Sequence, residues 1–152
     1  MTLATVGTRL ALLALLTGCA GGAAKPAVLD TRTDACGACR MAVSDRRFAA
    51  QLVAPGDEPV FFDDVGCLAS YLTQHAALPR GAVAYVADHR TREWVLASAA
   101  ILTKVGGLAT PMGSHVIAHA SAASRDADPA ARGGTPVLPA ALFAAPIPDG
   151  TR

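Results

Sequence analysis

Residues 48–72 read FAAQLVAPGDEPVFFDDVGCLASYL, and this stretch predicts how the first half of the chain folds. Apolar residues alternate over 48–53, a pattern typical of a strand, and the short apolar run 60–62 predicts a second strand. Pro55-Gly56-Asp57 between them is typical of a turn. We therefore expect the two strands to pair as a hairpin.

An amphipathic helix is predicted directly after this hairpin. Asp63 or Asp64 can cap its N-terminus, because a short acidic side chain accepts hydrogen bonds from the first backbone N–H groups. Pro79 and Gly81 end it, and the alternation over 82–87 predicts a third strand. The first half is therefore expected to be a strand-strand-helix-strand unit. The apolar face of the helix is expected to contain Val65, Leu68, Ala69, Leu72 and Ala76.

The second half has weaker patterns. Residues 121–132 contain helix-capping residues but also Pro129, so a helix there is expected to be short or broken. The other expected elements are a strand at 93–96, a short helix at 98–105 closed by Gly106 and Gly107, a strand at 115–120 and a strand near 137–138.

The composition limits the protein to one domain of ordinary size or two very small ones. The chain has 152 residues and a formal net charge of +1, so nothing in it indicates a basic nucleic-acid surface, and no nucleic-acid partner is expected. Along the chain we expect a signal peptide at 1–18, a flexible tether at 19–33, a first α/β unit at 34–90, a second at 91–145 and a disordered tail at 146–152.

The N-terminal residues are typical of an export signal. The apolar run 10–16 is too short to span a bilayer, because a spanning helix needs about 20 residues. Leu16-Thr17-Gly18-Cys19 resembles the bacterial lipobox, in which the cysteine is acylated. We expect export to the cell envelope and a lipid anchor at Cys19, in a membrane facing the periplasm. Ala20 favours the outer membrane, and an ordinary signal peptide with a chance cysteine is the alternative.

Asp34-Ala35-Cys36-Gly37-Ala38-Cys39-Arg40-Met41 is the stretch most informative about chemistry. A Cys-x-x-Cys pair is found in redox couples, zinc sites, structural disulfides and copper sites. Zinc favours four ligands, and the sequence has neither a second such pair nor a histidine pair at the zinc-finger distance from this one. A thioredoxin-like pair opens a helix after a strand, whereas this one follows a tether. The copper site is therefore favoured.

Met41 strengthens the copper interpretation. In an extended backbone, residues 39 and 41 share a face at a separation of roughly 6.6 Å, so a thiolate and a thioether can converge on one ion. Soft sulfur ligands select Cu(I). Packing of Met41 in the core is the alternative.

Thr110-Pro111-Met112-Gly113-Ser114-His115 is a second candidate site. Met112 lies between Pro and Gly, on a predicted tight loop, where it is a poor core residue and a candidate ligand. His115 is a secondary candidate because it is near Met112. His75, His89 and His119 are expected to be ordinary surface or core residues. The favoured role for Cys67 is a small buried apolar residue, with metal ligation or a disulfide to Cys36 as alternatives.

Together these segments resemble the NosL family of copper lipoproteins, accessory to nitrous oxide reductase. The Cys-x-x-Cys-x-Met box, the strand beginning Phe48-Ala49-Ala50-Gln51 and the lipobox all fit that family. So do Phe62-Asp63-Asp64-Val65-Gly66-Cys67-Leu68, Tyr85-Val86-Ala87-Asp88, Trp94 and Thr110-Pro111-Met112-Gly113.

The resemblance implies an α+β fold of two small strand-strand-helix-strand units, similar to a domain of the organomercurial lyase. It implies Cu(I) held by Cys39, Met41 and Met112, with Cys36 and His115 as further candidates. It also implies a metallochaperone, not an enzyme, that delivers copper to periplasmic nitrous oxide reductase for its copper-sulfide centre. A tethered thiol-disulfide protein using Cys36 and Cys39, or a general cell-envelope copper buffer, is the alternative.

Arg40 departs from the family, which usually has Gly between the second Cys and the Met. Arg adopts a positive φ less readily than Gly, so the geometry of the site is expected to change if that φ is needed. The cation of Arg40 is also expected to favour the thiolate form of Cys39.

Overall fold

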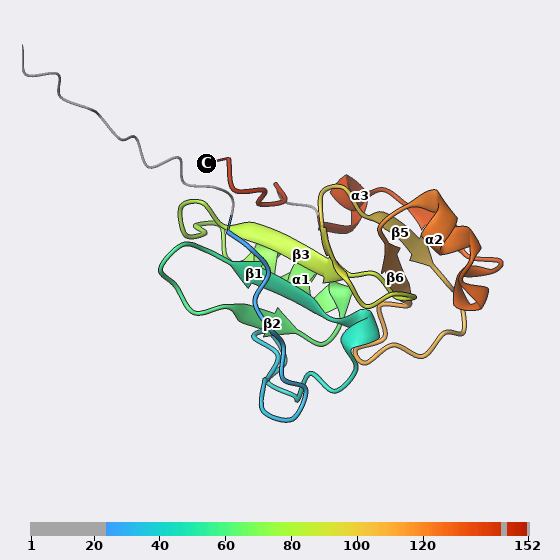
Figure 1. Cartoon of the computed structure of the whole chain (residues 1–152), viewed down its shortest axis with the longest axis horizontal. Helices are drawn as coiled ribbons and strands as arrows, with labels where there is room; N and C mark the ends of the chain where they lie inside the picture. The colour runs from blue at the N-terminus through green and yellow to red at the C-terminus, as the bar shows by residue number, and fades with distance from the viewer. Residues whose placement is uncertain (1–23, 144–145, 152) are drawn as a thin grey trace, which may run out of the picture.

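The computed structural model describes residues 24–143 and 146–151 of the chain. It contains two antiparallel sheets with short helices packed against them (Figure 1). In chain order the elements are η1 (Arg46–Phe48), β1 (Ala50–Val53), β2 (Val60–Phe62), α1 (Val65–Gln74), β3 (Val83–Ala87), β4 (Trp94–Leu96), β5 (Ile101–Lys104), β6 (Val116–His119), α2 (Ala122–Asp126), η2 (Pro129–Ala131), β7 (Thr135–Val137) and α3 (Pro139–Phe143).

The first sheet has the strand order β2-β1-β3-β4, and every neighbouring pair is antiparallel. Gln51 at its centre lies opposite Phe61 on one side and Tyr85 on the other, so the predicted hairpin and third strand are confirmed. All four residues of β1 are buried. Figure 1 shows why: α1 lies behind the sheet and the segment that begins at residue 24 (blue) crosses in front of it.

Helix α1 begins where the sequence predicted. Asp64 is its N-cap, and the Oδ1 atom of Asp64 accepts a hydrogen bond from the Gly66 N–H at 2.6 Å. Val65, Leu68 and Leu72 are buried on its inner face. Since Cys67 belongs to the first turn of α1, this cap also places a thiol at the end of β2, beside the Cys-x-x-Cys loop.

The second sheet repeats the arrangement of β1, β2 and β3 in the first. Its order is β6-β5-β7, so the first strand of the unit is again central and pairs antiparallel with the second and third strands. Helix α2 lies between β6 and β7 in the chain. The expected fold of two strand-strand-helix-strand units is therefore confirmed.

Two assignments in the second half were wrong. Residues 98–105 were expected to be a helix, but the structure has strand β5 at Ile101–Lys104. Thr103 pairs with Ile117 on one side and Pro136 on the other, and these long-range hydrogen bonds override a weak local helical pattern. Strand β4 was placed in the second unit, but it pairs with β3 in the first sheet.

One hydrophobic core extends under both sheets. It includes Phe62 and Leu68 from the first unit and Leu102 and Phe143 from the second. Asp88 connects the sheets, because its Oδ2 atom accepts the Ala120 N–H at 2.8 Å. The two units therefore share a core, which fixes the relative position of their loops.

Both terminal segments of the described chain pack against the first sheet. Residues 24–33 were expected to be part of a flexible tether, but the Ala27 N–H donates to the Oε1 atom of buried Gln51 at 2.7 Å. The tail was expected to be disordered, but the Ala84 N–H donates to the Pro148 carbonyl at 2.8 Å. Each segment satisfies backbone or amide groups of buried strands, which composition does not reveal.

Within residues 24–143 and 146–151, no helix is both long and apolar enough to cross a bilayer. The predicted signal at 1–18 and the predicted lipidation site Cys19 lie outside the described residues.

Candidate metal centre

The Cys-x-x-Cys segment forms a tight loop that is closed by its own backbone. The Cys36 N–H donates to the Met41 carbonyl at 2.7 Å, and the Arg40 N–H donates to the Cys36 carbonyl at 2.9 Å. The Gly37 N–H donates to the Phe61 carbonyl at 2.8 Å, which attaches the loop to β2. A Cβ atom on Gly37 would lie 2.3 Å from Val60, so only glycine allows this close approach.

Arg40 occupies the left-handed conformation in this loop, with φ of 67°. A non-glycine residue pays about 1–2 kcal/mol for that conformation. The conformation that a glycine would adopt freely is thus held by an arginine, and the strain lies in the backbone between Cys39 and Met41. The side chain of Arg40 is exposed.

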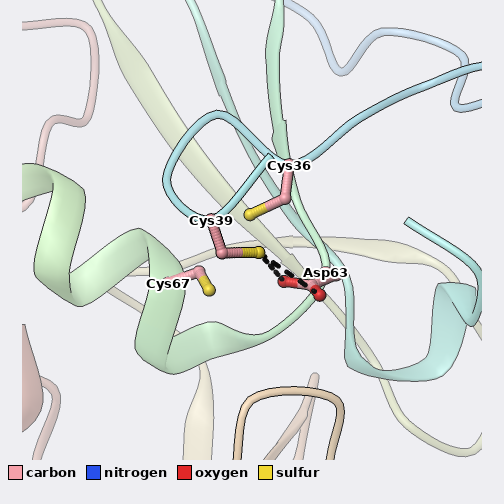
Figure 2. Close-up of side chains that lie close together, drawn as sticks. All are labelled: Cys36, Cys39, Asp63 and Cys67. Carbon is pink, nitrogen blue, oxygen red and sulfur yellow. Dashed lines mark hydrogen bonds between the residues drawn. The ribbon is translucent and has the colours of Figure 1, made fainter. Parts of the chain in front are cut away.

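Three thiols and one carboxylate converge between this loop and α1. The ligand atoms of Cys36, Cys39, Cys67 and Asp63 all lie within 4.8 Å of one another. Figure 2 shows that Cys36 and Cys39 come from the loop, Cys67 from the first turn of α1 and Asp63 from the segment just before it. None of the three thiols is in a disulfide. We call these four residues the sulfur cluster.

The sulfur cluster is largely removed from solvent. Cys36 is 0%, Asp63 1% and Cys67 5% exposed, and Cys39 is half-buried. The Cys39 thiol donates to both Asp63 carboxylate oxygens at 3.7 Å. Cys39 is therefore the cluster member through which solvent, or a partner, reaches the other two sulfurs.

Burial sets the protonation of these thiols. Burial raises the pKa of Cys39, and the neighbouring Cys36 and Asp63 raise it further. The backbone hydrogen bond from Met41 acts in the opposite direction and lowers this pKa. Burial likewise raises the pKa of Cys67. The expectation that Arg40 favours a Cys39 thiolate was wrong, because desolvation and neighbouring acidic groups outweigh an exposed guanidinium. A metal cation would compensate thiolate charge here, whereas the raised pKa values of Cys39 and Cys67 favour their protonated forms without one.

Asp64 brings the methionine loop to this cluster. While its Oδ1 atom caps α1, its Oδ2 atom accepts the Thr110 hydroxyl at 2.6 Å and the Met112 N–H at 3.2 Å. Gly66 permits the approach, since a Cβ atom there would lie 2.9 Å from the Ser114 Cβ. The loop that carries Met112 is thus tied to the residue next to Asp63.

Met41 lines the cleft beside the cluster, and Met112 directly follows Pro111, which lines the same cleft. Met41, Asp63, Thr110 and Pro111 line one open cleft. The side chains are unusually exposed for methionine, with Met41 at 49% and Met112 at 45%. Core packing of Met41, the alternative interpretation, does not agree with that exposure.

His115 is held within its own loop. Its Nδ1 atom bonds the Leu108 carbonyl at 2.7 Å, and its backbone has a φ of 59°. The structure therefore places Cys36 and Cys39 in the sulfur cluster and bonds the Met112 loop to Asp64, next to the cluster. One ring nitrogen of His115 already forms a hydrogen bond within its own loop. The assignment of individual residues as ligands stays a prediction.

Sequence reasoning missed Asp63 and gave Cys67 a structural role. One signal was present: Asp63 and Asp64 are adjacent before a helix, and a helix needs only one cap. With Asp64 as the cap, the second carboxylate is free to face the thiols. Three sulfurs and one carboxylate are a donor set that can hold a metal ion, and the sulfurs favour soft ions.

Comparison with known proteins gives one match. A protein-family model described as NosL matches residues 27–139, which is most of the chain. That range includes the whole sulfur cluster and the Met112 loop. No curated protein and no solved structure matches the chain.

Proposed function

The chain belongs to the NosL family of copper-binding accessory proteins, and on that premise we propose that it carries Cu(I) in the sulfur cluster and its methionine rim. The acceptor proposed is nitrous oxide reductase, during maturation of its copper-sulfide centre. The protein acts as a carrier and not as an enzyme. The single observation that supports this most is that three thiols and Asp63 meet beside a cleft that Met41 lines, with the Met112 loop bonded to the adjacent Asp64.

The donor types favour Cu(I) over zinc. Thiolate and thioether sulfurs are soft ligands that suit Cu(I), whereas zinc makes little use of a thioether. In the proposed bound state Cys39, Met41 and Met112 supply the sulfur ligands, as the family resemblance implies. Cys36 and Cys67 lie within reach as further thiols, and Asp63 accepts a hydrogen bond from the half-buried Cys39.

Release is proposed to occur by ligand exchange at the cleft. Cys36 and Cys67 are buried, but Met41 and Met112 are each nearly half exposed. A ligand from the acceptor can therefore replace a methionine first, while the thiols still hold the ion. Such an order keeps Cu(I) coordinated throughout and prevents its loss to solvent.

The cellular setting belongs to the same proposal. Export to the periplasm and a lipid anchor at Cys19 place the carrier at the membrane, as the lipobox pattern predicts.

A thiol-disulfide function is less well supported. A redox Cys-x-x-Cys pair needs a reactive thiolate, which a helix N-terminus usually provides. Here the pair lies in a loop, and burial raises the pKa of Cys39. A general copper buffer would use the same ligands, and transfer experiments separate it from a dedicated carrier.

Competition with a Cu(I) chelator tests the ligands. Cys39→Ser and Met41→Ala should each lower Cu(I) affinity by at least about tenfold, because each removes a soft donor. Leu138→Ala, which shortens another exposed apolar side chain, is the matched control. X-ray absorption should count only sulfur neighbours in the wild type. Unchanged affinity in both ligand variants would refute the site.

Transfer is measured separately. Copper-loaded protein mixed with copper-free nitrous oxide reductase should lose its Cu(I) to the enzyme faster than free Cu(I)-chelator complex does. Equal transfer rates would not contradict the proposed ligands, but they would support the alternative function of a general copper buffer.

A further inference from the structure

A second cluster of ligand-type side chains lies outside the sulfur cluster. The Nδ1 atom of His89 is 2.6 Å from the Oδ2 atom of Asp128, and the Nε2 atom of His119 is 3.0 Å from the same oxygen. His89 follows β3, His119 ends β6, and Asp128 caps η2. Two imidazoles from different sheets thus meet at one carboxylate oxygen.

The three side chains are buried and held in place. The exposed fraction is 0% for the His119 side chain, 6% for Asp128 and 7% for His89. The other Asp128 oxygen accepts the Ala130 N–H at 2.9 Å, and the His89 ring packs on Phe48 with centroids 5.1 Å apart. A charged carboxylate is therefore fixed between two rings that cannot easily turn away.

The charge on Asp128 is maintained by the rings. Burial raises the pKa of Asp128, but the hydrogen bonds from His119 and His89 outweigh it and lower the pKa overall. Arg47, the nearby cation, is already paired with Asp45 at 2.6 Å. The carboxylate therefore has no dedicated arginine partner among the described residues.

Each ring has a second nitrogen that forms no hydrogen bond. The Nε2 atom of His89 and the Nδ1 atom of His119 are buried without a partner among the described residues. Since Asp128 only accepts, each ring donates from the nitrogen that faces it. The second nitrogen of each ring therefore has, within the described part of the chain, no competing hydrogen bond that would have to be broken.

We propose that His89, His119 and Asp128 form a binding site for one divalent ion of the zinc and copper(II) class. Imidazole and carboxylate donors suit such ions, and three protein ligands leave a fourth position for water. The ion takes the place of the hydrogens now shared with Asp128, and each ring proton moves to the opposite nitrogen. Two ring N–H groups are then left without an acceptor, and the free energy of metal binding has to exceed that cost.

The two sites differ in the ions they select. The sulfur cluster offers soft donors, whereas this cluster offers only nitrogen and oxygen. His89 also lines the cleft that contains Met41 and Asp63, so an ion can reach the second site from the same opening. The chain would thus hold Cu(I) and a divalent ion at separate sites, which the proposed copper transfer does not require.

Zinc titration of the full chain tests this. The sulfur cluster is first filled with Ag(I), and Zn(II) binding is then followed by calorimetry. The wild type should bind one Zn(II), while His119→Phe and Asp128→Asn should each weaken binding at least about 100-fold. His75→Gln, at an exposed histidine after α1, is the matched control and should bind as the wild type does.

Two further readouts make the outcome decisive. Co(II) bound to the silver-filled wild type should give a ligand-field spectrum without a thiolate charge-transfer band. Circular dichroism checks folding, and if His119→Phe does not fold, Asp128→Asn, which keeps the side-chain size, decides. No Zn(II) binding by the wild type, equal binding by the folded variants, or a thiolate band would each overturn the proposal.

Discussion

The substitution Asp64→Asn should keep the N-cap of α1 but weaken the hydrogen bonds that hold the loop carrying Met112. The two carboxylate oxygens serve different elements: Oδ1 caps the helix at Gly66, and Oδ2 holds Thr110 and Met112. In Asp64→Asn the remaining oxygen keeps the cap, while the amide NH₂ faces the Met112 N–H. A donor then opposes a donor, and the loop loses its attachment.

The cost follows from the contacts that are lost. A hydrogen bond to a charged group contributes about 1.5–3 kcal/mol, and the bond to Met112 has no replacement. The Thr110 hydroxyl can rotate to accept from the new amide, so that contact is weakened and not lost. We therefore expect the free energy of unfolding to fall by about 2 kcal/mol. If Met112 is a ligand, displacement of its loop should lower Cu(I) affinity by about tenfold, or ~1.4 kcal/mol.

The assay combines urea unfolding of the metal-free protein with Cu(I) chelator competition. Asp57→Asn, at an exposed turn, removes a carboxylate far from this contact and should change neither quantity. The decisive comparison is with Met112→Ala. If Met112→Ala lowers Cu(I) affinity while Asp64→Asn lowers only stability, Met112 reaches the ion without this anchor and the reasoning fails.

Three other predictions concern the backbone and acid stability. Arg40→Gly should stabilise the protein by about 0.5–1 kcal/mol, because relief of the left-handed conformation outweighs the entropy of glycine; a loss of stability in urea unfolding would contradict this. Gly66→Ala should destabilise by about 1–3 kcal/mol through its contact with Ser114, whereas Gly106→Ala, which meets nothing within 4 Å, should not. Burial raises the pKa of Asp88, but hydrogen bonds from Ala120, Thr91, Ser124 and Arg90 lower it to about 2. The stabilisation by the Asp88 carboxylate is complete above about pH 5 and is lost as the pH falls toward about 2. The difference in free energy of unfolding between wild type and Asp88→Asn should therefore narrow by about 2 kcal/mol over that range. A difference that stays constant with pH would refute the assignment.

The first unit was predictable because its signals are local. An alternating strand, a Pro-Gly turn and an aspartate cap each depend on neighbours in the chain, and the hairpin of β1 and β2 followed from them. The second unit was predicted less well. Strand β5 contains Ile101, Leu102 and Thr103, and a run this short does not distinguish strand from helix. Its identity depends on pairing with β6 and β7, which are distant in sequence.

The candidate site divides in the same way. The Cys-x-x-Cys-x-Met box and the Pro-Met-Gly loop were visible as residue types with characteristic spacing. The sequence did not show that Asp64 would connect the two motifs. Its cap of α1 is a local contact, but its hydrogen bonds to the Met112 loop join residues far apart in the chain. Cys67 and Asp63 entered the cluster because α1 begins where the loop lies against β2.

By itself, then, the sequence determined the chemistry available: soft sulfurs in two short motifs, and a helix that starts at one of two adjacent aspartates. Only the tertiary structure decided which groups share a site. It brought Cys67 to the thiols, and it brought His89, His119 and Asp128 to one oxygen atom although nothing in their spacing links them. The physical reason is that caps, turns and hydrophobic periodicity depend only on residues that are close together in the sequence. Sheet pairing and core packing, by contrast, place distant segments side by side through free energy summed over the whole fold.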